Sequence, residues 1–222
     1  MTASSRPPSR LTPFQSALLH AFFANDRELF LTGGAALAGF WLGHRTTDDL
    51  ELFGLPGADL ERAVRTLEAV AADAGATSVV MQSYPDFRRL HVDRGEERCK
   101  VDLAVDRAPP LESMKVEIDG IRLDSPREIA ANKICTLLSR AEIRDLVDLR
   151  ALLELGCDLE AALRDAATKD RGADAATLGW ILDQLAIGPD ARLPGEVDPL
   201  DLETFRGTLV KRLRALAAAQ TR

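Results

Sequence analysis

The fold is decided by residues 29–52, which read LFLTGGAALAGFWLGHRTTDDLEL. The apolar run Leu29–Leu31 predicts a short strand, and it leads into the glycine pair Gly33-Gly34. The segment Ala35–Leu42, rich in alanine and leucine, predicts a compact helix that ends before a glycine. Acidic and apolar residues then alternate over Asp49–Phe53, which is the pattern of a half-buried strand. The stretch therefore predicts a strand–helix–strand unit with two glycines at its first turn.

This unit carries residue types that suit a phosphate and a metal ion. Paired glycines between a strand and a helix let a phosphate approach the backbone closely, and the helix N-terminus favours an anion there. Asp49 and Glu51 lie two residues apart on the predicted strand, so both side chains point to one face. Two converging carboxylates repel each other unless a cation lies between them, and hard oxygen ligands of this kind suit Mg²⁺.

A third carboxylate is available on a later predicted strand. In Cys99–Val105 the apolar side chains alternate with Lys100 and Asp102, which share the opposite face. If this strand pairs beside the strand of Asp49 and Glu51, Asp102 completes a triad of carboxylates. Such a triad could hold one or two metal ions that orient an attacking hydroxyl and stabilise a departing pyrophosphate.

The rest of the chain extends this unit into a larger α/β module. β-rich runs between turn signals predict strands over residues 78–82, 87–92, 98–105 and 116–123. Apolar residues at helical spacing predict helices over residues 12–25 and 59–74, and the chain from Pro126 onward is predicted to be helical. We therefore expect a flexible tail over 1–10, an α/β module over 11–125 and a helical module over 126–222.

Composition narrows the class of protein. Lys and Arg number 28 against 35 Asp and Glu, which gives a formal charge of −7 and argues against a general nucleic-acid coat, although a local basic patch remains open. No apolar run reaches the roughly 18 residues needed to span a bilayer, and the N-terminus has no apolar signal segment. The three cysteines make neither a disulfide framework nor a zinc spacing. We expect a cytoplasmic protein without a membrane partner.

These motifs together resemble a known fold. A Gly-Gly turn, a short helix, an acidic pair and a later strand carboxylate resemble the nucleotidyltransferase fold of the DNA polymerase β type. Within it, Gly33–Leu37 with His44-Arg45 and Thr47-x-Asp49-x-Glu51 is similar to the AbiEii/AbiGii toxin family, which includes MenT-type toxins and the toxins of type IV toxin–antitoxin systems. The later segments Lys133–Arg140 and Arg144–Asp148 are similar to the helical motif of that family.

The resemblance implies a fold, an activity and a set of site residues. The fold would be α+β, a short mixed sheet flanked by helices and followed by a C-terminal helical module. The enzyme would move a nucleoside monophosphate from an NTP to an acceptor hydroxyl, most simply at the 3′ end of a tRNA, and an antitoxin protein would be its partner. The implied catalytic residues are Asp49, Glu51, Asp102 and Lys133, of which the three carboxylates would bind Mg²⁺. The implied nucleotide-binding residues are Gly33, Gly34, Arg45, Thr47, Arg140, Arg144, Asp145 and Asp148.

Several interpretations stay open at this point. Glu51 stands where the family usually has aspartate, and its longer arm is compatible with a weakened enzyme or with a nucleotide-binding module that has lost catalysis. The acceptor could instead be a small molecule, such as an aminoglycoside, or a protein side chain. Lys133, Arg140 and Arg144 are spaced seven and four apart, which predicts one stripe on a helical surface. That stripe could bind phosphates, or it could belong to a salt-bridged helix in which Arg144 and Asp148 form an ordinary i,i+4 pair. Arg144, Asp145 and Asp148 could also be structural and tie the second module to the first.

Overall fold

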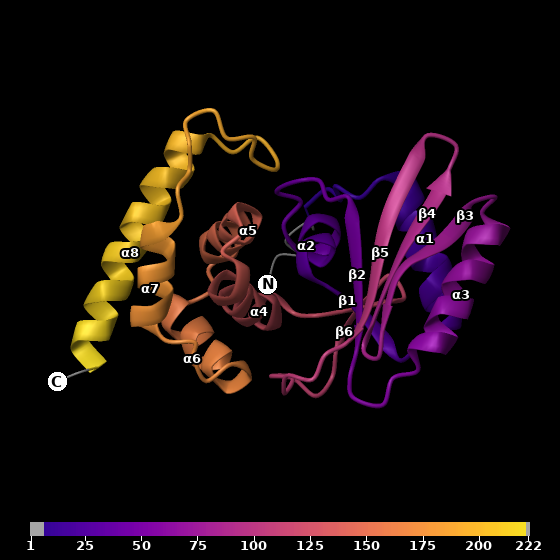
Figure 1. Ribbon diagram of the computed structural model, residues 1–222, viewed down its shortest axis with the longest axis horizontal. Helices are drawn as coiled ribbons and strands as arrows, with labels where there is room; N and C mark the ends of the chain where they lie inside the picture. The colour runs from indigo at the N-terminus through magenta and orange to yellow at the C-terminus, as the bar shows by residue number, and fades with distance from the viewer. Residues whose placement is uncertain (1–6, 221–222) are drawn as a thin grey trace, which may run out of the picture. The chain divides into compact units, whose positions relative to one another are not determined.

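The computed structural model describes residues 7–220, and these divide into two compact units (Figure 1). The first unit contains the described residues up to Arg107 together with Glu112–Ser125. The second contains Ala108–Leu111 and the chain from Pro126 onward. The predicted tail lies partly outside the described residues. Within them, Arg10 donates its backbone N–H to the Ala38 carbonyl at 3.0 Å and its Nε to the Gly43 carbonyl at 3.2 Å.

A seven-stranded mixed sheet forms the centre of the first unit, with the strand order β3-β4-β5-β2-β1-β7-β6. The pairs β2–β5 and β1–β7 are parallel, and the others are antiparallel. The strand bounds are β1 Leu29–Thr32, β2 Asp49–Gly54, β3 Thr77–Tyr84, β4 Phe87–Arg94, β5 Glu97–Val105, β6 Val116–Ile118 and β7 Ile121–Leu123. The predicted short mixed sheet is thus confirmed, and it places the strand of Asp102 next to the strand of Glu51.

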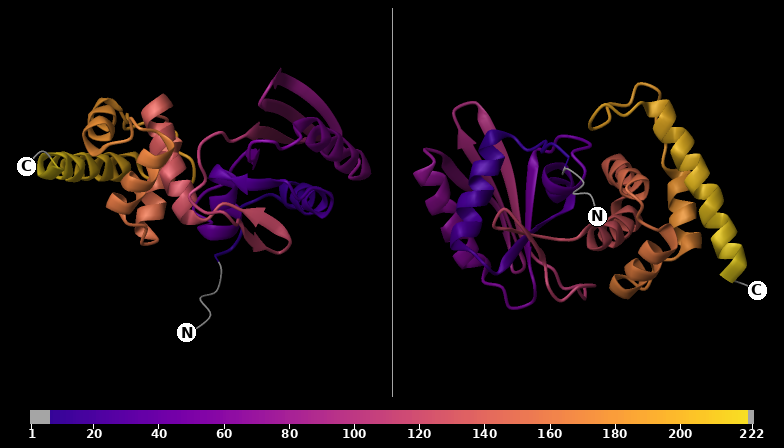
Figure 2. Two further views of the ribbon diagram at one scale, coloured as in Figure 1. Left: turned by 90° about the horizontal axis from the view of Figure 1, so that it is seen from below. Right: turned by 180° about the vertical axis from the view of Figure 1, so that it is seen from behind.

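Two long helices, α1 (Pro13–Asn25) and α3 (Leu60–Asp73), belong to this unit, and they pack against each other. A capping box between Thr12 and Gln15 begins α1, and the Asp59 side chain caps α3. Figures 1 and 2 show α3 along one face of β3, β4 and β5. The apolar side chains of the alternating strands are buried on this side, among them Leu50, Leu90, Val92, Val101 and Leu103. We call the other side of β3–β5, which carries the polar side chains, the open face.

The segment after the Gly33-Gly34 pair differs from the predicted helix. An α-helical turn, α2 (Gly33–Ala36), begins two residues earlier than predicted, and a π-helical segment, η1 (Leu37–Trp41), follows it. The Leu42 N–H donates to the Leu37 carbonyl at 2.8 Å, which is the i→i+5 bond of a π-helix. Gly43 then turns the chain with φ +58°, and a Cβ there would lie 2.4 Å from the Pro8 carbonyl oxygen. These bonds depend on contacts with the segment before α1, which local periodicity does not reveal.

The second unit consists of five described helices. Their bounds are α4 Pro126–Arg140, α5 Ile143–Glu154, α6 Leu159–Lys169, α7 Ala175–Gln184 and α8 Pro199–Gln220. Helix α4 packs against α5, α6 and α7, and α8 packs against α7 and α5. Ala141 takes the left-handed conformation with φ +47° and ends α4, so Arg140 and Arg144 lie on different helices. The prediction of a single stripe through Lys133, Arg140 and Arg144 is therefore wrong.

The described helices were also compared with the length and hydropathy that a bilayer requires. Among residues 7–220, no helix combines enough length with enough apolar character to cross a membrane.

Candidate active site

The predicted carboxylates meet on two paired strands. In the parallel β2–β5 ladder, Glu51 lies opposite Asp102 and Asp49 lies opposite Lys100. In the antiparallel β4–β5 ladder, Arg89 lies opposite Asp102 on the other side. Because side chains alternate along a strand, all of these residues project from the same face of the sheet. The three carboxylates and two cations thus form one charged cluster.

Two carboxylates of the cluster, Asp49 and Asp102, each pair with a basic side chain. Asp49 Oδ2 lies 2.6 Å from Lys100 Nζ, and Asp102 accepts two hydrogen bonds from Arg89, both at 2.7 Å. The hydrogen bonds to Asp102 raise the pKa of Arg89 against the opposing effect of burial, and the charges of Asp49 and Glu51 raise it further. Arg89 therefore stays positively charged at any physiological pH. The sequence placed Lys100 on this face but gave no sign of Arg89, since its partner depends on the strand register.

The glycine pair lies against the third carboxylate. Gly33 has φ +62°, and a Cβ at this residue would lie 1.7 Å from Glu51 Oε2. The Gly34 N–H donates to the same oxygen at 3.2 Å, and a Cβ at Gly34 would lie 2.5 Å from Arg45 Nη2. The positive φ favours glycine at Gly33, and at both positions an added Cβ would displace the end of a charged side chain. The Gly34 N–H faces the Glu51 carboxylate, and the phosphate that the sequence predicts at this turn stays a prediction.

Arg45 and Thr47 shape the turn that enters β2. Arg45 is 6% exposed and donates from Nη1 to the Thr46 carbonyl at 2.9 Å. The Thr47 hydroxyl donates to the Asp49 carbonyl at 3.3 Å, and Gln15 of α1 donates to the Thr47 carbonyl at 2.7 Å. The first unit therefore gathers one group of the predicted site residues around the start of β2: Gly33, Gly34, Arg45, Thr47, Asp49, Glu51 and Asp102.

A buried polar cluster that the sequence did not indicate supports the same turn. Asp124, which is 1% exposed, accepts a hydrogen bond from the Thr32 hydroxyl at 2.6 Å and another from Lys115 Nζ at 2.6 Å. Its carbonyl accepts from Trp41 Nε1 at 2.9 Å. These contacts join the end of β1 to η1 and fix the chain on both sides of Gly33. No sequence signal could identify the cluster, because its members are scattered over more than ninety positions.

The remaining predicted site residues form an ion-pair cluster in the second unit. Lys133 Nζ lies 2.7 Å from Asp145 Oδ1 and 2.7 Å from Asp148 Oδ2, and both aspartates are fully buried. Arg140 donates to Asp145 at 3.0 Å, and Arg144 Nε lies 2.5 Å from Glu142 Oε2. Lys133 therefore joins α4 to α5 within the second unit. Its predicted contact with a nucleotide stays a prediction.

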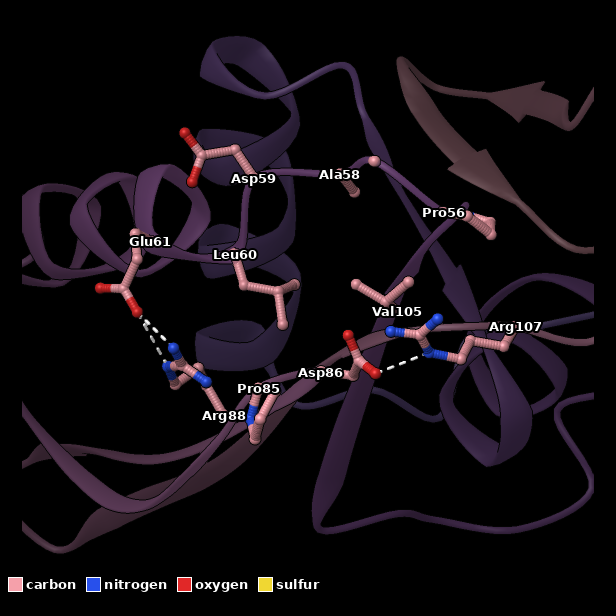
Figure 3. Close-up of a pocket in the computed structure, with 11 residues that line it drawn as sticks. Pro56, Ala58, Asp59, Leu60, Glu61, Pro85, Asp86, Arg88, Val105 and Arg107 are labelled. Carbon is pink, nitrogen blue, oxygen red and sulfur yellow. Dashed lines mark hydrogen bonds and ion pairs between the residues drawn. The ribbon is translucent and has the colours of Figure 1, made fainter.

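A pocket with a volume of about 240 Å³ lies at the far ends of β2 and β5 (Figure 3). Arg107 Nε binds Asp86 Oδ2 at 2.7 Å, and Arg88 binds Glu61. The hydrogen bond from Arg107 lowers the pKa of Asp86. These charges are paired with one another, and the residues that line the pocket include none of the predicted site residues.

The carboxylate cluster fits a divalent cation by its chemistry, although not as a formed coordination shell. Asp49, Glu51 and Asp102 supply hard oxygen donors from one face of two neighbouring strands. Within residues 7–220, no group of three or more His, Cys, Asp or Glu side chains is arranged to hold a metal ion. A cation would instead require the carboxylates to turn away from Lys100, Arg89 and Gly34.

Comparison with known proteins then identifies the family. The model of the nucleotidyl transferase AbiEii toxin family, of the type IV toxin–antitoxin system, matches residues 16–220. The chain belongs to the AbiEii family. This confirms the resemblance drawn from the Gly-Gly and acidic motifs, and it makes the chain a nucleotidyltransferase of a type IV toxin family, which implies an NTP substrate and a cognate antitoxin.

Solved structures agree on the fold of the AbiEii chain. JHP933 from Helicobacter pylori is 22% identical, with a TM-score of 0.55 and 93% of each chain covered. A candidate nucleotidyltransferase from H. pylori is 20% identical, with a TM-score of 0.59. The match covers 90% of this chain and 93% of the H. pylori chain. A search of curated proteins finds no match.

Proposed function

We propose that this AbiEii protein is a cytoplasmic toxin that transfers a nucleoside monophosphate from an NTP to the 3′ hydroxyl of a tRNA and releases pyrophosphate. The observation that carries the proposal is the register of β2 against β5, which puts Glu51 opposite Asp102 and Asp49 next along the same face. Three carboxylates on one face, beside a glycine turn whose N–H faces an anion, suit the transfer of a phosphoryl group. A cognate antitoxin would restrain the activity in the cell.

In this proposal the glycine turn and the residues before β2 hold the triphosphate. In the structure the Gly34 N–H donates a hydrogen bond to Glu51, and a phosphate oxygen of the NTP would replace Glu51 as the acceptor. Arg45, whose guanidinium lies against Gly34, would balance the charge of that phosphate, with the Thr47 hydroxyl beside it. Displacing Glu51 from Gly34 would free its carboxylate for the cluster, so nucleotide and cation binding would favour each other.

Mg²⁺ would be held by Asp49, Glu51 and Asp102, where it would neutralise the charge that develops on the transferred phosphate and on the leaving pyrophosphate. Asp102 would also accept the proton of the attacking hydroxyl. For that step one of its oxygens must be released from Arg89, which binds both of them. Arg89 and Lys100 would then hold the carboxylates in place through their remaining bonds.

The family resemblance also implies roles for charged residues of α4 and α5. Lys133 would offset the charge of the pyrophosphate, and Arg140 and Arg144 would bind phosphates or orient Asp145 and Asp148. The ion pairs of Lys133 with these aspartates support a stabilising role equally well.

The experiment uses purified protein, total tRNA, Mg²⁺ and each α-labelled NTP in turn. We expect label in tRNA with one or more nucleotides, and none after the tRNA is oxidised with periodate, because oxidation destroys the 3′-terminal hydroxyls. A chelator should abolish the transfer. Label in oxidised tRNA, in the protein itself or only in an added aminoglycoside would contradict the proposed acceptor.

A further inference from the structure

An aromatic row lies beside the carboxylates on the open face of the sheet. Cross-strand register places Tyr84 of β3 opposite Phe87 of β4, Phe87 opposite Ala104 of β5, and Ala104 opposite Phe53 of β2. The next row along the strands is the charged one, with Arg89, Asp102 and Glu51. Because two residues along a strand span roughly 6.5–7 Å, the aromatic row lies about one nucleotide's length from Asp102.

The rings of this row are at least partly accessible to solvent, and Tyr84 is the most exposed of them. Tyr84 is 60% exposed, and Phe53 and Phe87 are half-buried. The Tyr84 and Phe87 rings have centroids 6.4 Å apart and planes inclined by 31°, so they lie beside each other as a tilted pair. The Arg89 guanidinium lies 5.3 Å from the Phe87 centroid and also binds Asp102. Arg89 thus connects the aromatic row directly to the charged cluster.

The geometry of phosphoryl transfer assigns a side of the cluster to the acceptor. The attacking and leaving oxygens lie roughly in line on opposite sides of the phosphorus. The glycine turn that would hold the leaving pyrophosphate follows β1, which pairs with β2 on the side away from β5. The acceptor hydroxyl must therefore approach from the side of β4 and β3, where the aromatic row lies.

One arginine of the β3–β4 hairpin lies on the open face beside the aromatic row. Arg89 is two residues from Phe87 on β4, so both side chains project from the same face. Arg88 points to the other face, where it binds Glu61. Arg89 is therefore the arginine next to the aromatic row that could contact an RNA base or phosphate.

We propose that Tyr84 and Phe87 form a stacking platform for an unpaired base at the 3′ end of the acceptor RNA. This inference rests on the proposed function and assigns the acceptor side of that site. Unpaired RNA bases are commonly held by stacking on aromatic rings and arginine planes, and β-sheet surfaces serve this purpose. Stacking next to the carboxylates would hold the terminal hydroxyl in place without reading the sequence of the RNA.

Steady-state kinetics test the platform as a binding element. Tyr84→Ala and Phe87→Ala should each raise KM for tRNA by about tenfold, which corresponds to the loss of stacking of one base on one ring. KM for the NTP should stay unchanged, and Tyr84→Phe, which keeps the ring, should restore most of the tRNA affinity. Trp180→Ala is the matched control, because Trp180 is an exposed aromatic residue of the second unit, at 67%. If both alanine variants leave KM for tRNA within twofold of the wild type, the inference is wrong while the proposed function stands.

A spectroscopic readout separates the inference from catalysis. Tyr84 is the only tyrosine in the sequence, so the full chain labelled with 3-fluorotyrosine gives one ¹⁹F signal. An RNA hairpin with an unpaired 3′ overhang should shift that signal, and the same hairpin with a blunt end should not. If no label reaches RNA, the proposed function fails, and the ¹⁹F titration still decides whether the platform binds an unpaired end. Equal shifts with both hairpins, or none with either, would overturn the inference.

Discussion

Replacing Lys133 separates a structural role of this residue from a catalytic one. The Lys133 side chain is 7% exposed and lies 2.7 Å from one oxygen of each of two fully buried aspartates. Asp145 keeps hydrogen bonds from Arg140 when Lys133 is removed, whereas Asp148 loses this ion pair. In Lys133→Met the alkyl stem is retained, so the variant removes the charge and little of the packing.

We expect Lys133→Met to lower the free energy of unfolding by about 3–5 kcal/mol, because breaking a buried ion pair leaves charge in the interior without its partner. For a chain of this size, each kcal/mol corresponds to about 2–4 °C in the melting temperature, so the midpoint should fall by roughly 6–20 °C. Adding Asp148→Asn to the variant should recover part of the loss, since it removes a charge that Lys133 balances in the wild type. Lys211→Met, at an exposed lysine of α8, should leave the midpoint nearly unchanged.

The assay combines thermal unfolding by circular dichroism with nucleotide transfer, measured well below the lowest midpoint. A structural role predicts lost stability and nearly normal kcat in the fraction that stays folded. Unchanged melting together with a large fall in kcat would refute this reasoning and place Lys133 at the pyrophosphate.

Further predictions concern the glycine turn, a buried thiol and a helix cap. Gly33→Ala and Gly95→Ala both place alanine at φ +62°, but only at Gly33 would the Cβ meet Glu51. We therefore expect Gly33→Ala to lose nucleotide transfer and Gly95→Ala to keep it. Equal losses of transfer in the two variants would contradict this reasoning. Burial raises the pKa of the Cys99 thiol to about 12, with a further rise from Asp49, so Cys99 should resist alkylation in the folded protein, as mass spectrometry would detect. Because the unfolded thiol ionises near pH 9, its contribution to stability should be lost as pH rises from about 9 to 12, and urea unfolding of wild type should show a steeper loss than Cys99→Ala. Asp174→Ala removes the side-chain cap of α7 and should lower the free energy of unfolding in urea by about 1 kcal/mol. An unchanged urea midpoint would contradict this prediction.

The sequence predicts those features that depend on local pattern. The alternation over Asp49–Phe53 identifies β2 because one face of that strand is buried and the other is polar. The same alternation puts Asp49 and Glu51 together, and it aligns Lys100 with Asp102 on β5. The sequence alone does not show that the strand of Asp102 pairs with the strand of Glu51. The structure shows this pairing, with Glu51 of β2 opposite Asp102 of β5.

Features that depend on distant contacts could not be predicted. Arg89 joins the carboxylate cluster only because β4 pairs with β5 at one register, and Asp124 supports the glycine turn from β7's end. The break at Ala141 was missed because its left-handed conformation has no glycine or proline to mark it. Because of this break, Arg140 and Arg144 lie on two different helices, α4 and α5, which are joined by the ion pairs of Lys133.

The most direct test of the central claim compares isosteric variants in the tRNA transfer assay. Asp49→Asn and Asp102→Asn each remove one negative charge from the cluster without changing its shape, and Asp93→Asn removes a half-buried charge that pairs with Arg98 on the same sheet. If the carboxylates of β2 and β5 act as one site, each cluster variant should lower kcat/KM by at least a hundredfold, and Asp93→Asn should retain wild-type activity. Full activity in Asp49→Asn or Asp102→Asn would show that nucleotide transfer takes place elsewhere in the chain.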